Sequence, residues 1–183
     1  ALLGATLGGA DWALAGLMST LVIAFVIKGG VSTVSVSVTV LGVAWIGLGL
    51  AHALLLRDID EHGVLAVLTV LLAVWAGDAG AYFIGLLFGR HKLAPTVSPG
   101  KTWEGLIAGI VATIGVTFLA LYEANFLSIP ESLVLGAVIA IAAPLGDLFE
   151  SALKRDADVK DSGRLLAGHG GVLDRIDALL FAW

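Results

Sequence analysis

Long apolar stretches run through most of this chain, and they constrain its fold more than any other feature. A helix needs about 20 apolar residues to cross the roughly 30 Å hydrocarbon core of a bilayer. Stretches of about that length recur along the chain and are separated by short polar segments. We therefore predict five membrane-spanning helices, at about 12–27, 34–56, 64–89, 105–122 and 132–152.

Both ends of the sequence are apolar as well. Residues 1–10 have the character of the end of an earlier span, and residues 172–183 that of the beginning of a further one, so we expect a piece of a longer protein. Residues 34–40 alternate like a β-strand, but a lone strand in a bilayer would leave backbone groups unsatisfied, so we assign them to a helix. The predicted fold is all-α, a polytopic transmembrane helix bundle of at least five spans with partial spans at both ends.

The composition excludes a water-soluble globular fold. Hydrophobic residues make up 58% of the chain and charged residues 14%, whereas soluble domains average about 25% charged residues. Cysteine is absent, which excludes disulfides, thiolate metal sites and cysteine nucleophiles. The net charge of −5, without a basic stripe, indicates no nucleic-acid binding. The 24 glycines suit close helix packing and are compatible with a homodimer.

The basic residues predict an orientation in the membrane, because cytoplasmic loops carry an excess of Lys and Arg. The connections at 28–33, 90–104 and 153–171 are rich in basic residues. The connections between them, at 57–63 and 123–131, have Arg57 as their only basic residue. We therefore expect an integral, multi-pass protein whose segments 90–104 and 153–171 are cytoplasmic and can meet at one membrane face. The basic residues of the three connections are Lys28, Arg90, Lys92, Lys101, Lys154, Arg155, Lys160 and Arg164.

Polar residues that suit phosphate chemistry begin near the end of the last predicted span. Asp147, Glu150, Ser151 and Lys154 are spaced i, i+3, i+4 and i+7, so they share one face of a helix. A carboxylate inside an apolar span is energetically costly, and it marks a candidate functional site. Asp147 therefore becomes the leading candidate on this helix.

A glycine-rich turn and two further carboxylates follow. The Gly-His-Gly-Gly turn at 168–171 can direct backbone N–H groups at an anion, and Asp174 and Asp177 follow on one helix face. Carboxylates suit Mg²⁺, which commonly joins one or two of them to substrate phosphates, and two cations could clamp the oxygens of an in-line displacement. The alternative is a solvated loop with ordinary surface charges. We disfavour it because Asp147 and Asp174 both have apolar surroundings.

A second polar segment, Ser98 to Gly105, precedes a predicted span. Its Gly-Lys-Thr sequence is not a P-loop, because the required earlier glycine would fall at Pro95. Ser98, Lys101 and Thr102 at a helix N-terminus suit a phosphate or ribose phosphate. The alternative is a capped helix start whose lysine extends to the membrane interface.

Asp78 lies in the middle of a predicted span and should face the interior of the bundle. Its Gly-Asp motif recurs at Gly146-Asp147. The roles of metal ligand, nucleotide contact and structural hydrogen-bonding residue all stay open for Asp78. We assign no chemistry to His52, His62 or His91.

Together these residues resemble the phosphatidate cytidylyltransferase (CDP-diacylglycerol synthase) family. The resemblance is carried by S-x-x-K-R-x4-K-D-S-G and G-H-G-G-x-x-D-R-x-D between Ser151 and Asp177, by S-P-x-K-T-W-E-G at 98–105, and by the two Gly-Asp motifs. It extends from about residue 75 onward. The sequence departs from the family at Gly100, where a basic residue is frequent, and at Ala167, where Pro is frequent.

The resemblance implies a Mg²⁺-dependent reaction of CTP with phosphatidate that yields CDP-diacylglycerol and diphosphate. The lipid phosphate would attack the α-phosphorus of CTP directly, and such an ionised nucleophile needs no strong general base. The resemblance also implies N-terminal spans at 1–70 and a catalytic membrane region at 71–183, in a bacterial plasma membrane with the site facing the cytoplasm.

The resemblance also implies roles for individual residues. Asp147 and Asp174 would be catalytic metal ligands, with two cations in the site, and Lys154, Lys160 and His169 would be further catalytic residues. Substrate and nucleotide contacts would be Ser98, Lys101, Thr102, Glu104, Asp78, Arg155, Asp161, Arg164, Gly170, Gly171, Arg175 and Asp177.

Other classes of membrane protein compete with this interpretation. A CDP-archaeol synthase would perform the same chemistry on an ether lipid, and a polyprenol or phytol kinase would transfer a phosphate. A CDP-alcohol phosphotransferase is disfavoured because its signature is absent from the sequence. A cation-coupled transporter could use Asp78 and Asp147 near the midplane, but it would not need a phosphate site.

Overall fold

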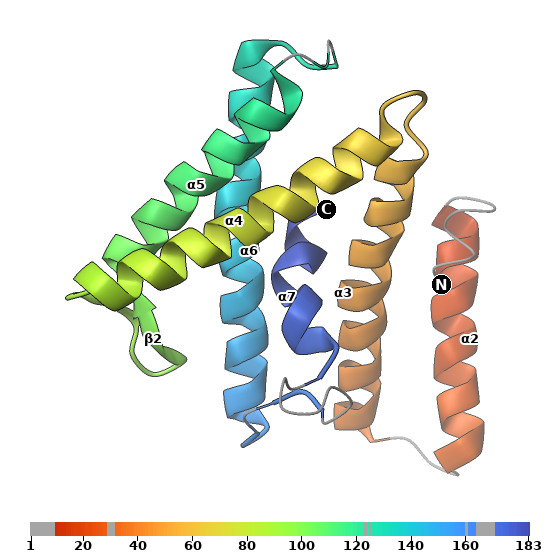
Figure 1. Cartoon of the computed structure of the whole chain (residues 1–183). Helices are drawn as coiled ribbons and strands as arrows, with labels where there is room; N and C mark the ends of the chain where they lie inside the picture. The colour runs from red at the N-terminus through yellow and green to blue at the C-terminus, as the bar shows by residue number, and fades with distance from the viewer. Residues whose placement is uncertain (1–9, 29–31, 123, 125, 160, 164–170) are drawn as a thin grey trace. The chain divides into compact units, whose positions relative to one another are not determined.

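The computed structural model describes residues 10–28, 32–122, 124, 126–159, 161–163 and 171–183. These residues are almost entirely helical (Figure 1). The chain divides into two compact units, residues 1–63 and 64–183, and each is described by itself.

The first unit contains two long helices, α2 (Ala10–Lys28) and α3 (Thr33–Arg57). Ser32 caps α3, because its hydroxyl oxygen accepts a hydrogen bond from the backbone N–H of Ser35 at 3.1 Å. The helix includes the stretch at 34–40 that alternates like a strand, so its assignment to a helix is confirmed.

The second unit contains the remaining helices and a short hairpin. Helices α3 to α6 are each long and apolar enough to span a membrane, with 18-residue windows of mean hydropathy 2.0. The predicted all-α membrane bundle is therefore confirmed. The elements are α4 (Gly63–Phe88), β1 (Lys92–Ala94), β2 (Ser98–Thr102), α5 (Trp103–Leu121), α6 (Ile129–Asp156) and α7 (Leu173–Ala182).

Small residues bring α4 and α5 into close contact. A Cβ atom added at Gly109 would lie 2.9 Å from the carbonyl oxygen of Gly77, so only glycine fits here without a shift of backbone. One turn further along α5, the Thr113 hydroxyl donates a hydrogen bond to the Ala73 carbonyl at 3.2 Å. Such small-residue contacts are typical of membrane helices, and here they fix the part of α4 that carries Asp78.

The segment between α4 and α5 is an antiparallel hairpin, where the sequence predicts a loop. Strands β1 and β2 pair Lys92 with Thr102 and Ala94 with Ser98 across an irregular register. Thr102 ends the hairpin and caps α5, since its hydroxyl accepts the Gly105 N–H at 3.2 Å. The hairpin thereby fixes the backbone of Lys101 next to the start of α5.

Helix α6 contacts both strand β2 of the hairpin and helix α7. It begins where the Glu131 carboxylate accepts the Ser128 N–H at 2.8 Å. Near its other end it packs against α7, where a Cβ atom at Gly146 would lie 2.7 Å from the carbonyl oxygen of Asp177. This approach places the α7 backbone beside the residue that precedes Asp147.

Candidate functional site

A cavity of about 670 Å³ is formed by α4, the hairpin, α5 and α6. Its wall combines apolar helix residues such as Val74, Leu86 and Leu106 with charged and hydroxyl side chains. A lining of both kinds suits an amphipathic ligand better than an ion alone. The charged and hydroxyl side chains in the lining are Asp78, Tyr82, Lys92, Ser98, Lys101, Thr102, Thr113 and Asp147.

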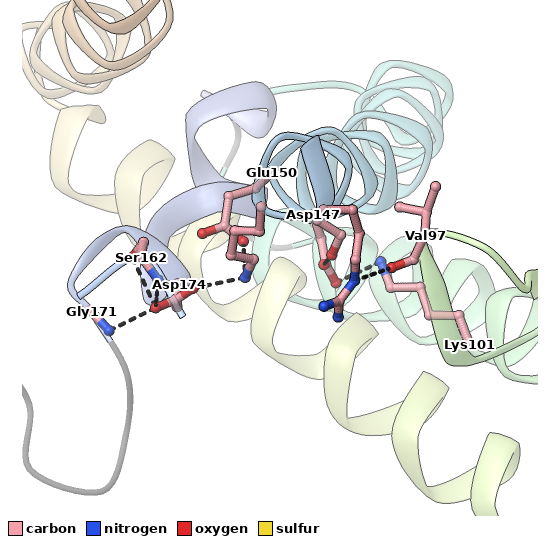
Figure 2. Close-up of polar contacts among 10 residues, drawn as sticks. Val97, Lys101, Asp147, Glu150, Ser162, Gly171 and Asp174 are labelled. Carbon is pink, nitrogen blue, oxygen red and sulfur yellow. Dashed lines mark hydrogen bonds and ion pairs between the residues drawn. The ribbon is translucent and has the colours of Figure 1, made fainter. Parts of the chain in front are cut away.

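The cavity brings together two polar segments that are far apart in sequence. Lys101 Nζ lies 2.6 Å from Asp147 Oδ2, and Figure 2 shows the lysine extending from the hairpin to α6. A second link is the hydrogen bond from Arg155 Nε to the Val97 carbonyl at 3.3 Å. The hydrogen bond between Arg155 and Val97 brings the segments 90–104 and 153–171 into contact, and their position at one membrane face stays a prediction.

Three aspartates from three helices interact electrostatically around Lys101. Asp78 of α4 is repelled by Asp147 of α6 and by Asp177 of α7. Lys101 attracts all three carboxylates and forms an ion pair with Asp147. The sequence assigned Asp78 and Asp177 to substrate binding and Asp147 to metal binding. The structure places all three in one electrostatic cluster, because α6 packs against α7 and the hairpin reaches across to α6.

A second cluster surrounds Asp174 at the start of α7. One carboxylate oxygen accepts a hydrogen bond from Lys154 Nζ at 2.7 Å, and the other accepts the Ser162 hydroxyl at 2.8 Å and the Gly171 N–H at 2.7 Å (Figure 2). Burial alone would raise the pKa of Asp174, but these hydrogen bonds lower it below its ordinary value. Asp174 is therefore ionised at neutral pH, which is the state that binds cations.

Glu150 is a further member of this cluster, which helical spacing places on the face of Asp147 and Lys154 but to which the sequence assigns no role. The residue is 1% exposed, and its carboxylate lies 2.5 Å from Lys154 Nζ. Its i+3 spacing from Asp147 and its i−4 spacing from Lys154 were the signals that could have identified it.

Two predicted site residues have structural partners in the hairpin. Glu104 accepts hydrogen bonds from the backbone N–H groups of Arg90 and His91 at 3.1 and 3.3 Å, and its other oxygen lies 2.6 Å from His91 Nδ1. His91, which received no chemistry from the sequence, therefore helps to fix the hairpin. Thr102 lines the cavity, and its hydroxyl oxygen accepts the hydrogen bond from Gly105 that caps α5.

The remaining predicted site residues fall into two groups. Ser98 is half-buried in the cavity wall, whereas Arg155, Asp161 and Arg175 are exposed. The others, Lys160, Arg164, His169 and Gly170, lie outside the described residues.

The carboxylates fit a magnesium ion that arrives with a phosphate ligand better than one held by protein alone. Within the described ranges, no three acidic or histidine side chains are close enough together to hold an ion by themselves. Asp147 and Asp174 instead contact different lysines, Lys101 and Lys154. Mg²⁺ commonly uses one or two carboxylates together with substrate phosphates and water, so ionised oxygen ligands of this kind fit it.

Comparison with known proteins agrees with the motifs. A family model described as the cytidylyltransferase family matches residues 5–183. Over 126 residues the chain is 47% identical to a phosphatidate cytidylyltransferase of Haemophilus influenzae, which covers 66% of this chain and 44% of that protein.

Two further relatives carry the same name. The Bacillus subtilis protein is 41% identical over 143 residues, which is 77% of this chain and 53% of that protein. The Staphylococcus aureus protein is 37% identical over 168 residues, which is 90% of this chain and 63% of that protein. The chain thus spans about half the length of the curated relatives it matches. Because the family match extends over nearly all of its residues, the chain belongs to the cytidylyltransferase family.

Proposed function

We propose that this chain forms the catalytic region of a phosphatidate cytidylyltransferase, a nucleotidyltransferase that converts CTP and phosphatidate to CDP-diacylglycerol and diphosphate. The observation that carries the proposal is the ion pair between Lys101 and Asp147 in the wall of a cavity that also has apolar lining. The names of the relatives supply the substrate class.

The reaction requires one bond to form and one to break at the same phosphorus. A phosphate oxygen of phosphatidate bonds to the α-phosphorus of CTP, and the bond from that phosphorus to the bridging oxygen breaks, so that diphosphate leaves with the electron pair. Because the nucleophile is already an anion, the chain needs to position and neutralise the reactants rather than remove a proton.

The lysines supply positive charge for the reacting phosphates. Lys101 lines the cavity, and its side chain is 24% exposed, so it can contact a ligand there. Lys154 lies on the same face of α6 as Asp147, at the Asp174 cluster. Fixed ammonium groups in a site shielded from water stabilise charge on phosphoryl oxygens more strongly than they would in water.

Asp147 and Asp174 are the proposed ligands of Mg²⁺, with two cations in the site. When bound, Mg²⁺ would supply charge neutralisation at the phosphates. Support comes from the chemistry of the two residues, since both are carboxylates on elements that meet, and hydrogen bonds keep Asp174 ionised.

The proposed location is the bacterial plasma membrane, with the site facing the cytoplasm, where CTP is available. The four apolar helices are consistent with a multi-pass protein, and the basic loops support this orientation. The proposed partners are the lipid bilayer, phosphatidate and CTP, and a homodimer stays a proposal from the glycine content.

The test is release of diphosphate by the detergent-purified full chain, supplied with CTP, Mg²⁺ and phosphatidate. We expect release only when all three are present, together with a CDP-lipid product. Asp147→Asn and Asp174→Asn should each abolish turnover without loss of the thermal unfolding transition. Phosphate transfer from CTP to a polyprenol would instead indicate a lipid kinase, and a folded protein without either reaction would refute the proposal.

A further inference from the structure

Glu150 has an environment that demands a fixed positive partner. Both of its carboxylate oxygens are inaccessible to solvent, and the residue as a whole is 1% exposed. An ionised carboxylate in such a place is unfavourable unless a positive charge lies against it. With so little exposed surface, Glu150 also cannot contact a substrate, so any effect on the reaction must pass through a neighbour.

That neighbour is Lys154, whose ammonium joins two carboxylates. Its Nζ lies 2.5 Å from Glu150 Oε2 and 2.7 Å from Asp174 Oδ1, and the two carboxyl groups also interact with each other. The cluster thus joins two carboxyl groups to one ammonium group. Figure 2 shows Glu150 on α6 beside Asp174, with Ser162 and Gly171 on the far side of the aspartate.

Lys101, which lines the cavity, has a different arrangement. Lys101 pairs with Asp147, and these side chains are 24% and 34% exposed, whereas those of Lys154 and Glu150 are 18% and 2% exposed. Lys101 can therefore exchange its carboxylate for a phosphate in the cavity. Lys154 cannot leave without depriving the buried Glu150 carboxylate of its ion-pair partner.

We propose that Glu150 is a positioning residue that holds the Lys154 ammonium, so that Asp174 can bind the cation of the nucleotide without losing the lysine. This inference rests on the proposed function. The Glu150 carboxylate, in contact with Lys154, keeps a partner for the lysine when Asp174 binds a divalent cation. When Glu150 is replaced by an uncharged residue, Asp174 is the remaining ion-pair partner of Lys154 within the described cluster, and the lysine competes with the cation for it.

The test is binding of Mn²⁺, measured by electron paramagnetic resonance on the detergent-purified full chain with saturating CTP. Glu150→Gln should weaken Mn²⁺ binding by about tenfold, because it removes one charge and keeps the shape. The double variant Glu150→Gln with Lys154→Met should recover most of that loss, since the competing ammonium is gone. Glu131→Gln, the same substitution at the other end of α6, is the matched control and should bind like wild type.

The recovery separates positioning from structural damage, because a second lesion in a merely damaged cluster would not restore binding. If the Gln variant does not fold, Glu150→Asp keeps the charge and should bind Mn²⁺ within about threefold of wild type. Wild-type affinity in a folded Glu150→Gln protein, no recovery in the double variant, or a tenfold loss in Glu150→Asp would overturn this inference alone. Wild-type protein that binds no Mn²⁺ with CTP would overturn the proposed function and this inference with it.

Discussion

Replacing Gly105 by alanine tests whether the close approach of α4 and α5 positions the candidate site. A Cβ atom at Gly105 would lie 2.6 Å from the carbonyl oxygen of Ala81, whereas ordinary contact begins at 3.4 Å. The α4 backbone would therefore have to move by roughly 0.8 Å. Overpacking of this kind costs about 1–3 kcal/mol. Because Asp78 lies about one helical turn from Ala81, the same movement displaces a carboxylate of the cavity wall.

We expect two measurable effects of Gly105→Ala. The midpoint of thermal unfolding in detergent should fall by about 2–4 °C for each kcal/mol lost. Diphosphate release should fall by about 10- to 100-fold, since misplacement of reacting groups by about 1 Å can cost that much. Gly115→Ala is the matched control on the same helix, because no atom lies within 4 Å of the added Cβ there.

The control variant should keep wild-type activity within about twofold, and its stability should be unchanged or slightly higher, because alanine favours helix over glycine. A Gly105→Ala protein as stable and as active as Gly115→Ala would show that the helices can separate without cost. The close packing of small residues would then not position Asp78.

Three further predictions concern charged residues of the site and the hairpin. Lys101→Met should raise the KM for CTP by about tenfold or more, because a charge-assisted contact to phosphate is lost, and an unchanged KM in a diphosphate-release assay would exclude that role. The folded-state pKa of Asp174 lies below its ordinary value of 3.8, so its ionised form stabilises the protein fully above about pH 4, and this contribution is lost as the pH falls toward the folded-state pKa. Thermal unfolding midpoints between pH 7 and pH 3 should therefore fall less for Asp174→Asn than for wild type, and equal slopes would contradict the assignment. Glu104→Ala should lower the unfolding midpoint more than Glu104→Gln does, since only the amide keeps an acceptor for the N–H groups of Arg90 and His91, and equal midpoints would show that these bonds do not stabilise the hairpin.

The sequence alone determined the features that depend on neighbouring residues. Apolar length located the spans that became α3 to α6, because the thickness of the bilayer fixes how many residues a helix needs. The 3.6-residue period placed Asp147, Glu150 and Lys154 on one face of α6, and the ion pair between Glu150 and Lys154 confirms that face.

Tertiary structure decided which charges meet, because those contacts depend on how helices pack rather than on local spacing. The pairing of Lys101 with Asp147 needs the hairpin, which formed in a segment too short and too polar for a strand pattern to identify it. The Glu104 carboxylate contacts the His91 ring and the backbone N–H groups of Arg90 and His91 rather than the cavity, because the chain before the hairpin places those groups beside it. Lys154 joins Glu150 to Asp174 only because α7 packs against α6, and residues 20 apart in sequence carry no pattern that predicts such a contact.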